Sequence, residues 1–178
     1  KAIEVFIRVL EVNSDTVETH LALGNLFRRR GEVERAIRIH QNLIARPTLE
    51  REQRSLALLE LGQDYLKAGL LDRAENLFLE LAEIRAHSEQ ALKLLLHIYQ
   101  QEKEWEKAIA VVHRLARVSG RDMNSMIAHF YCELAELDYA HHNHASARER
   151  LKRALAADTK CVRASILRVP GIYAADRL

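Results

Sequence analysis

Two matched pairs of glycines constrain the fold of this 178-residue chain more than any other feature. Gly24 and Gly31 lie seven residues apart, Gly62 and Gly69 have the same spacing, and the second pair follows the first after 38 residues. Leu-Gly-x-x-aromatic precedes each turn, and Arg-Ala follows it. Glycine commonly ends a helix, so the pattern predicts repeated helical hairpins and argues against one continuous coiled coil.

An alanine after each turn extends the repeat along the chain. This position is occupied by Ala2, Ala36, Ala74, Ala108 and Ala147, with spacings of 34, 38, 34 and 39 residues. Two spacings equal the tetratricopeptide period, and the others need short inserts, which fall near 46–49 and 120–122. Mostly apolar residues follow each alanine after four and seven positions, which predicts a buried stripe on every second helix.

These observations predict an all-α fold, a right-handed tetratricopeptide solenoid of about five hairpins. About half of the residues are Ala, Glu, Lys, Leu or Arg, and only two are proline, which fits helices and disfavours sandwiches, barrels and wound sheets. We expect a single domain over 1–178, with repeats near 1–14 (partial), 17–50, 55–88, 89–122, 123–160 and 161–178 (partial). First helices are predicted near 16–30, 50–68, 88–102 and 123–141, and another begins near 160. Second helices are predicted near 1–12, 33–46, 71–85, 105–118 and 144–157.

Local signals mark several helix ends. Asp15 and Glu18 form the pattern of a capping box, and Asp122 is suited to cap the helix that follows the second insert. Small residues such as Gly24 and Gly62 are expected where the two helices of a hairpin cross closely. The tail from Ile166 departs from the repeat, and Pro170 would break a helix there.

Bulk properties exclude several function classes. The net charge of +2 and the pI of about 8.6 are too balanced for nucleic acid to be the main partner. The two cysteines, Cys132 and Cys161, are not part of a C-x-x-C motif. We expect small, partly buried thiols in a reducing compartment, and a disulfide between them is left open. No run of 18 apolar residues is present to span a membrane. The chain starts without Met and inside a helical pattern, so we interpret it as a fragment, whose exposed ends leave a homodimer open.

The candidate binding surface is the face formed by the first helices, which line the concave side of such solenoids. Its polar side chains could bind an extended peptide or a partner helix through hydrogen bonds, although each taken singly is more simply a solvated residue. The predicted positions are Asn25, Arg28, Arg29, Gln63, Lys67, Lys93, His97, Gln100, His129, Glu133 and Glu136.

Other polar clusters have simpler interpretations. Three consecutive arginines, 28–30, close a first helix, where positive charges interact favourably with the helix dipole. The alternative is that they bind an acidic partner or lipid head groups. The histidines of 141–144 are interpreted as a solvated turn, because neighbouring residues rarely converge on zinc. His40 and Trp105 are expected to be packing residues, Trp105 across its hairpin turn. No catalytic motif or metal-binding motif is present, so the sequence predicts a non-enzyme without a cofactor.

Several stretches resemble the lipopolysaccharide assembly protein B family of bacterial inner-membrane proteins. They are residues 20–41, 127–135, 73–78 and the segment around Glu104 and Trp105. The resemblance covers most of 1–165 and fades after that.

The resemblance implies a non-enzymatic adaptor at the cytoplasmic face of the inner membrane. Members of the family carry an N-terminal membrane helix and a C-terminal rubredoxin-like zinc module, neither of which is within this chain. They couple the membrane protease FtsH to LpxC, the deacetylase of lipid A synthesis, and they work with other lipopolysaccharide assembly factors. Two alternatives stay open: a generic peptide-binding co-chaperone, and an RNA-binding helical repeat, which the balanced charge disfavours.

Overall fold

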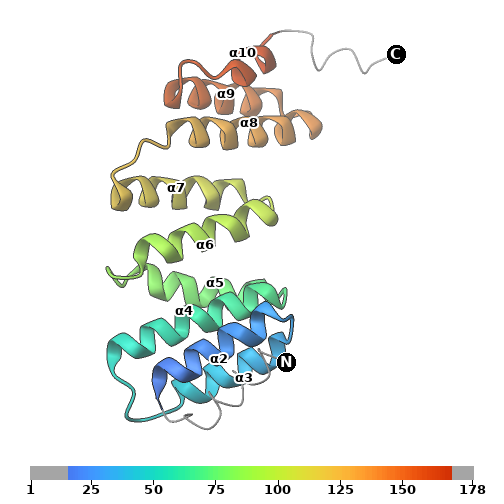
Figure 1. The fold of residues 1–178 in the computed structure, drawn as a ribbon. Helices are drawn as coiled ribbons and strands as arrows, with labels where there is room; N and C mark the ends of the chain where they lie inside the picture. Colours follow the sequence, from blue (N-terminus) through green and yellow to red (C-terminus); the bar gives the residue numbers. More distant parts are fainter. Residues whose placement is uncertain (1–15, 170–178) are drawn as a thin grey trace. The chain divides into compact units, whose positions relative to one another are not determined.

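The computed structural model describes residues 16–169, which form helices and turns and contain no strand. The first helices of the hairpins are α2 (Val17–Arg29), α4 (Arg51–Lys67), α6 (Ser88–Gln101) and α8 (Asn124–Ala140). The second helices are α3 (Val33–Ile44), α5 (Leu71–Ala82), α7 (Trp105–Ser119) and α9 (His144–Ala157). The short α10 (Val162–Leu167) follows them, and Figure 1 labels all of these helices along the chain.

The predicted helix ranges are confirmed for every segment within the described residues, and their ends differ by at most three residues. The helix predicted over 1–12 and the proline expected to break the last helix lie outside these residues. At the two glycine crossings the agreement has a simple cause: the close approach of the helices requires small residues at fixed places, and Gly24 and Gly62 are visible in the sequence.

The capping prediction at the start of α2 is wrong. Thr16 is the N-cap, because its Oγ1 accepts a hydrogen bond from the Thr19 backbone N–H at 3.2 Å. Threonine and aspartate are both good N-caps, so residue type alone could not decide between neighbouring positions. Before α8, Asp122 Oδ1 accepts a hydrogen bond from the Asn124 backbone N–H at 2.9 Å, although Met123 occupies the N-cap position.

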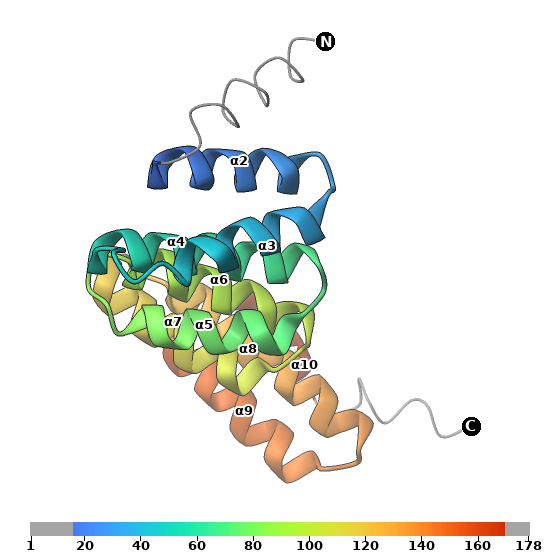
Figure 2. The same ribbon diagram turned by 90° about the horizontal axis from the view of Figure 1, so that it is seen from below.

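The chain divides into two compact units, Lys1–Ala91 and Leu92–Leu178. In the first unit α3 packs against both α2 and α4, as the second view also shows (Figure 2). Gly24 and Gly62 lie at the two hairpin crossings: a Cβ at Gly24 would overlap the His40 ring, and one at Gly62 would overlap Phe78. The prediction that small residues permit these crossings is therefore confirmed.

In the second unit, α8 packs on α7 and α9, and α10 packs on α8 and α9. The core between α8, α9 and α10 consists mainly of small residues, including Ala128, Cys132 and Ala147, with Leu151 as a large member. The buried stripe predicted on the second helices is confirmed in both units. Its members within the described residues are Ala36, His40, Leu43, Ala74, Phe78, Leu81, Ala108, Val112, Leu115, Ala147, Leu151 and Ala154.

The turn inside each described hairpin uses one residue with a left-handed backbone. Gly31 and Gly69 take this position in the first unit, with φ of 82° and 75°. Lys103 and His142 take it in the second unit, with φ of 58° and 60°. Side chains with a Cβ are disfavoured in this conformation, so the second unit uses the same turn at a higher conformational cost.

Candidate partner-binding surfaces

The first helices of the first unit are joined by one arginine. Arg28 of α2 donates from Nη2 to Glu60 Oε2 at 2.7 Å and from Nη1 to Asp64 Oδ1 at 2.8 Å. The same Nη1 donates to the Glu60 backbone carbonyl at 3.1 Å. Glu60 and Asp64 are four residues apart on α4 and therefore point in similar directions. We call Arg28, Glu60 and Asp64 the α2–α4 clamp.

The α2–α4 clamp extends into the core through a histidine. Asp64 and His40 are both fully buried, and His40 Nδ1 lies 2.5 Å from Asp64 Oδ2. No hydrogen-bond partner for His40 Nε2 is found in the described part of the chain. The expectation that His40 is a packing residue holds for its burial, but its partner is a carboxylate from the next hairpin. A buried carboxylate loses its hydration, and hydrogen bonds or opposite charges must replace it. Asp64 therefore depends on its contacts with Arg28 and His40.

The surroundings of Arg28 favour its charged form. Burial by itself lowers the pKa of Arg28. The hydrogen bonds to Glu60 and Asp64, together with the negative charges of these two residues, raise the pKa by more than burial lowers it. The net pKa lies above the ordinary value for arginine, so the guanidinium stays charged at every physiological pH. Its donors are directed at α4, and the α2–α4 clamp therefore serves the cohesion of the first unit.

The second unit contains a corresponding clamp. Arg163 of α10 donates from Nη1 to Glu133 Oε1 at 2.6 Å, and its Nη2 lies 2.8 Å from Glu136 Oε1. Arg163 Nη1 also lies 3.1 Å from His129 Nδ1. Burial lowers the pKa of Arg163, but the two glutamates raise it more strongly, so the net shift is upward. We call Arg163, Glu133 and Glu136 the α8–α10 clamp; it is roughly one-third exposed.

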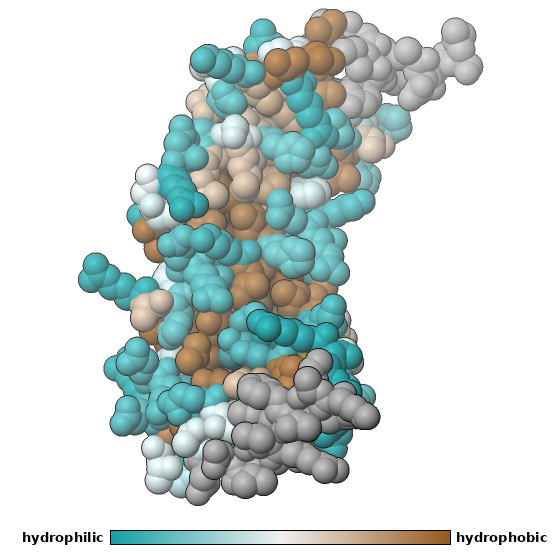
Figure 3. Space-filling view, in the orientation of Figure 1, coloured by the Kyte–Doolittle hydropathy of each residue, from teal (hydrophilic) through white to brown (hydrophobic). Residues whose placement is uncertain are grey.

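The predicted surface residues therefore fall into two groups. Arg28, His129, Glu133 and Glu136 contact side chains of the same unit, as described above. The side chains of Lys67, Lys93, His97 and Gln100 are exposed, as is that of Arg29, whereas Asn25 and Gln63 are half-buried. Figure 3 shows that hydrophilic side chains cover much of the visible face, with apolar patches between them. The exposed group therefore comprises the predicted residues whose side chains are accessible at the surface.

The structure changes one further prediction and agrees with another. Trp105 was expected to pack across its own hairpin turn, but its ring stacks on Phe130 of α8, with centroids 5.5 Å apart. The histidine-rich turn is exposed; His141 Nδ1 bonds the Leu137 carbonyl at 2.8 Å, and the His142 and His144 rings are 6.3 Å apart. Across residues 16–169, no group of three or more His, Cys, Asp or Glu side chains could hold a metal ion.

Sequence reasoning missed three members of the clamps: Glu60, Asp64 and Arg163. A signal for Asp64 was present, because an acidic residue stands at the repeat position that the apolar Leu26 occupies in α2. A second signal is His40 itself. Four residues after the repeat alanine, the other described second helices have an apolar residue, such as Phe78. Two polar departures in adjacent hairpins indicate a buried pair. Arg163 had no comparable signal, because an arginine on a short terminal helix is unremarkable.

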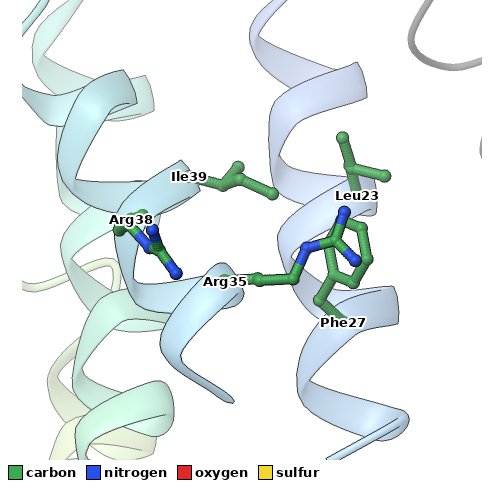
Figure 4. A pocket seen from close by; sticks show the side chains of 5 residues that line it. All are labelled: Leu23, Phe27, Arg35, Arg38 and Ile39. Atoms are coloured by element: carbon green, nitrogen blue, oxygen red, sulfur yellow. The ribbon is translucent and has the colours of Figure 1, made fainter. Parts of the chain in front are cut away.

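An open groove of about 390 Å³ lies between α2 and α3 (Figure 4). Leu23 and Phe27 line it from α2, and Arg35, Arg38 and Ile39 line it from α3. The Arg35 guanidinium lies over the Phe27 ring, 3.8 Å from its centroid, in a cation–π contact. The groove therefore has an apolar floor and a basic rim.

Comparison with known proteins defines the class first. A family model of the tetratricopeptide repeat matches residues 19–55. The crystal structure of MamA protein superposes with a TM-score of 0.56 at 19% identity, covering 89% of this chain and 82% of that one. The C-terminal part of a TPR repeat-containing protein from Cytophaga hutchinsonii superposes with a TM-score of 0.55 at 18% identity. The match covers 92% of this chain and 66% of that one. The chain is an all-α helical repeat of the tetratricopeptide type.

Sequence relatives show a closer resemblance than the solved structures do. Lipopolysaccharide assembly protein B of Escherichia coli (strain K12) is 48% identical over 167 residues, which are 94% of this chain and 43% of the relative. The protein of the same name from Haemophilus influenzae is 39% identical over 175 residues, covering 94% and 44%. The chain thus spans less than half the length of these curated relatives. It is a tetratricopeptide-repeat homologue of lipopolysaccharide assembly protein B. Within the described residues, no helix is long and apolar enough to cross a membrane.

Proposed function

We propose that this chain is the partner-binding part of a non-enzymatic adaptor that regulates lipopolysaccharide synthesis. The adaptor presents the deacetylase LpxC to the membrane protease FtsH at the cytoplasmic face of the inner membrane. The observation that carries the proposal is the 48% identity to lipopolysaccharide assembly protein B over 94% of the chain. The tetratricopeptide fold supports it, because such repeats present rigid helix faces to protein partners.

The exposed side chains of the first helices supply the proposed contacts. Lys67 closes α4 in the first unit, and His97 and Gln100 lie on α6 in the second. They stand on helices whose neighbouring faces are buried, so the backbone that carries them is fixed, and none of them is a clamp member. Side chains on rigid elements lose less conformational entropy on binding than those on loops. We therefore assign partner contact to this exposed group and cohesion to the clamps.

A reconstituted degradation assay tests the proposal. The complete adaptor, LpxC and FtsH are mixed with ATP, and the half-life of LpxC is measured with and without the adaptor. We expect the adaptor to shorten this half-life severalfold. An unchanged half-life would contradict the coupling.

Two substitutions that each introduce a negative charge locate the surface by direct binding measurements. Lys67→Glu and His97→Glu are expected to weaken partner binding at least threefold, measured by titration with each partner. Lys152→Glu is the matched control, because Lys152 is an exposed cation on the second helix α9. If only the control variant lost binding, the partner contact would have to be assigned to the second helices.

A further inference from the structure

The two cysteines of the chain lie next to each other in the second unit. Cys132 is on α8 and fully buried, whereas Cys161 is partly exposed and is the N-cap of α10. Their Sγ atoms are 3.9 Å apart, although 29 residues separate them in sequence. Both are free thiols in the structure. An accessible thiol that is oxidised first, with a second thiol beside it to complete the disulfide, is the arrangement found in redox-sensing cysteine pairs.

We propose that Cys132 and Cys161 are an oxidation site that closes to an intramolecular disulfide when the protein meets hydrogen peroxide. The Cys161 thiolate attacks one peroxide oxygen, the O–O bond breaks, and the hydroxide that leaves takes up the proton lost from Cys161. Cys161 is then a sulfenic acid. Cys132 Sγ attacks Cys161 Sγ, the S–O bond breaks, and the hydroxyl leaves as water with the Cys132 proton. Two thiols are oxidised, and one peroxide is reduced to two waters.

Accessibility and charge decide the order of these steps. Peroxide reaches Cys161, which is partly exposed, and cannot reach Cys132, whose side chain is fully buried. Burial raises the pKa of Cys132 to about 12, and the neighbouring Cys161 thiolate adds to the rise. Cys132 therefore stays protonated while Cys161 is oxidised, and it loses its proton only as it attacks the sulfenic acid.

The disulfide would tie the start of α10 to α8. Arg163 is only two residues beyond Cys161, and it holds Glu133 and Glu136 in the α8–α10 clamp. The clamp is partly exposed and opens at little cost, whereas a covalent link prevents α10 from leaving α8. Oxidation would therefore keep the two glutamates covered by Arg163, and reduction would let α10 move. This consequence concerns α10 alone and does not rest on the proposed function.

Mass spectrometry of the whole chain tests the proposal. Reduced protein is treated with hydrogen peroxide, quenched with catalase and alkylated with iodoacetamide. We expect an intact monomer that has lost two hydrogen atoms, takes up no alkyl group, and yields one linked peptide containing Cys132 and Cys161. Hydrogen exchange of the α10 amides should slow at least tenfold on oxidation and recover with dithiothreitol.

Matched variants make each outcome decisive. In Cys161→Ser the remaining thiol should resist peroxide at least tenfold better than Cys161 does in Cys132→Ala, because Cys132 is buried. Circular dichroism checks that both variants fold. Sulfinic acid on Cys161 with Cys132 still alkylatable after unfolding would overturn the proposal. A disulfide formed only between two chains, or unchanged exchange of α10 in the oxidised monomer, would overturn it as well.

Discussion

The two clamps use the same chemistry in different surroundings. In each, one arginine binds two carboxylates on a neighbouring first helix. In the α2–α4 clamp Asp64 is fully buried and also contacts the buried His40. In the α8–α10 clamp the side chains are 25–36% exposed, and the arginine stands on a helix of six residues. Burial, and not the number of ion pairs, therefore separates a clamp that holds a unit together from one that can open.

The comparison extends to the turns of the two units. At the left-handed positions inside the hairpins, the first unit has glycine in both turns, and the second has Lys103 and His142. The second unit thus combines a partly exposed clamp with turns of higher conformational cost. We expect it to be the more easily opened of the two, and the following experiments test each part of this difference.

The largest effect is expected at Asp64. Asp64→Leu removes the acceptor that Arg28 and His40 share, and breaking a buried pair costs about 3–5 kcal/mol. Urea unfolding followed by circular dichroism measures the loss. Glu60→Gln is the matched control in the same clamp, where about 1 kcal/mol or less is expected since Glu60 is partly exposed. Equal losses in the two variants would show that burial does not set the difference.

A double variant sharpens this result. Asp64→Leu with His40→Phe places at both positions the residue types that the repeat has elsewhere, at Leu26 and Phe78. The polar pair is then replaced as a whole, so no imidazole is left without its acceptor. We expect the double variant to be more stable than the sum of the single losses predicts, with a coupling of about 1–3 kcal/mol. Strict additivity would refute a direct interaction of His40 with Asp64.

An intermediate effect is expected at the helix crossings. Gly24→Ala and Gly62→Ala each force a Cβ onto a ring, and overpacking of this kind costs about 1–3 kcal/mol. His40 is held by Asp64, whereas Phe78 has no hydrogen-bonding group and can adjust by packing alone. Gly24→Ala should therefore lower the free energy of unfolding more than Gly62→Ala does. Thermal melts of both variants provide the measurement, and the reverse order would argue against a fixed imidazole.

Smaller effects, opposite in sign to each other, are expected at the turns of the two units. Gly31→Ala should lower the free energy of unfolding by about 1 kcal/mol, because alanine is disfavoured at a φ of 82°. Lys103→Gly should raise it by about 0.5–1 kcal/mol for the same reason. Lys103→Ala keeps the Cβ and should leave stability unchanged. If Lys103→Ala also stabilised the protein, the cost at this position would come from the lysine side chain and not from the backbone conformation.

The smallest effect is expected at the exposed clamp. Arg163→Ala should lower the free energy of unfolding by only about 0.5 kcal/mol, as is typical of partly solvated ion pairs. Hydrogen exchange of the α10 amides should nevertheless become faster, because α10 loses its polar link to α8. Arg153→Ala, which removes an exposed pair with Glu149 on α9, is the control and should leave α10 unchanged. A loss comparable to that of Asp64→Leu would erase the distinction between the clamps.

The repeat register and the helices were predictable from the sequence alone. Close crossings tolerate only small side chains, so Gly24 and Gly62 had to appear at fixed distances from the alanines that follow the turns. The buried stripe repeats for the same reason. Thr16 shows the limit of local reasoning, because neighbouring residues of similar capping strength compete and the path of the chain decides.

For the predicted binding surface, the structure was needed to separate the residues that belong to clamps from those whose side chains are exposed. Arg28 and Glu133 are polar residues on first helices, and nothing in their local sequence says that each pairs within its own unit. Pairing depends on which side chains meet across helices, and residues such as Arg28 and Asp64 are 36 positions apart. The exposed group, including Lys67 and His97, remains a prediction as a binding surface.

The sequence by itself determined a helical repeat, because packing identical hairpins requires a periodic pattern of small and apolar residues. It also determined the relationship to lipopolysaccharide assembly protein B, since identity is a property of the sequence. Only the tertiary structure decided which polar groups are buried together, which arginine binds which acids, and that Cys132 and Cys161 are neighbours. The physical reason is that these contacts depend on distances in space, and a periodic sequence does not encode such distances for its irregular, polar positions.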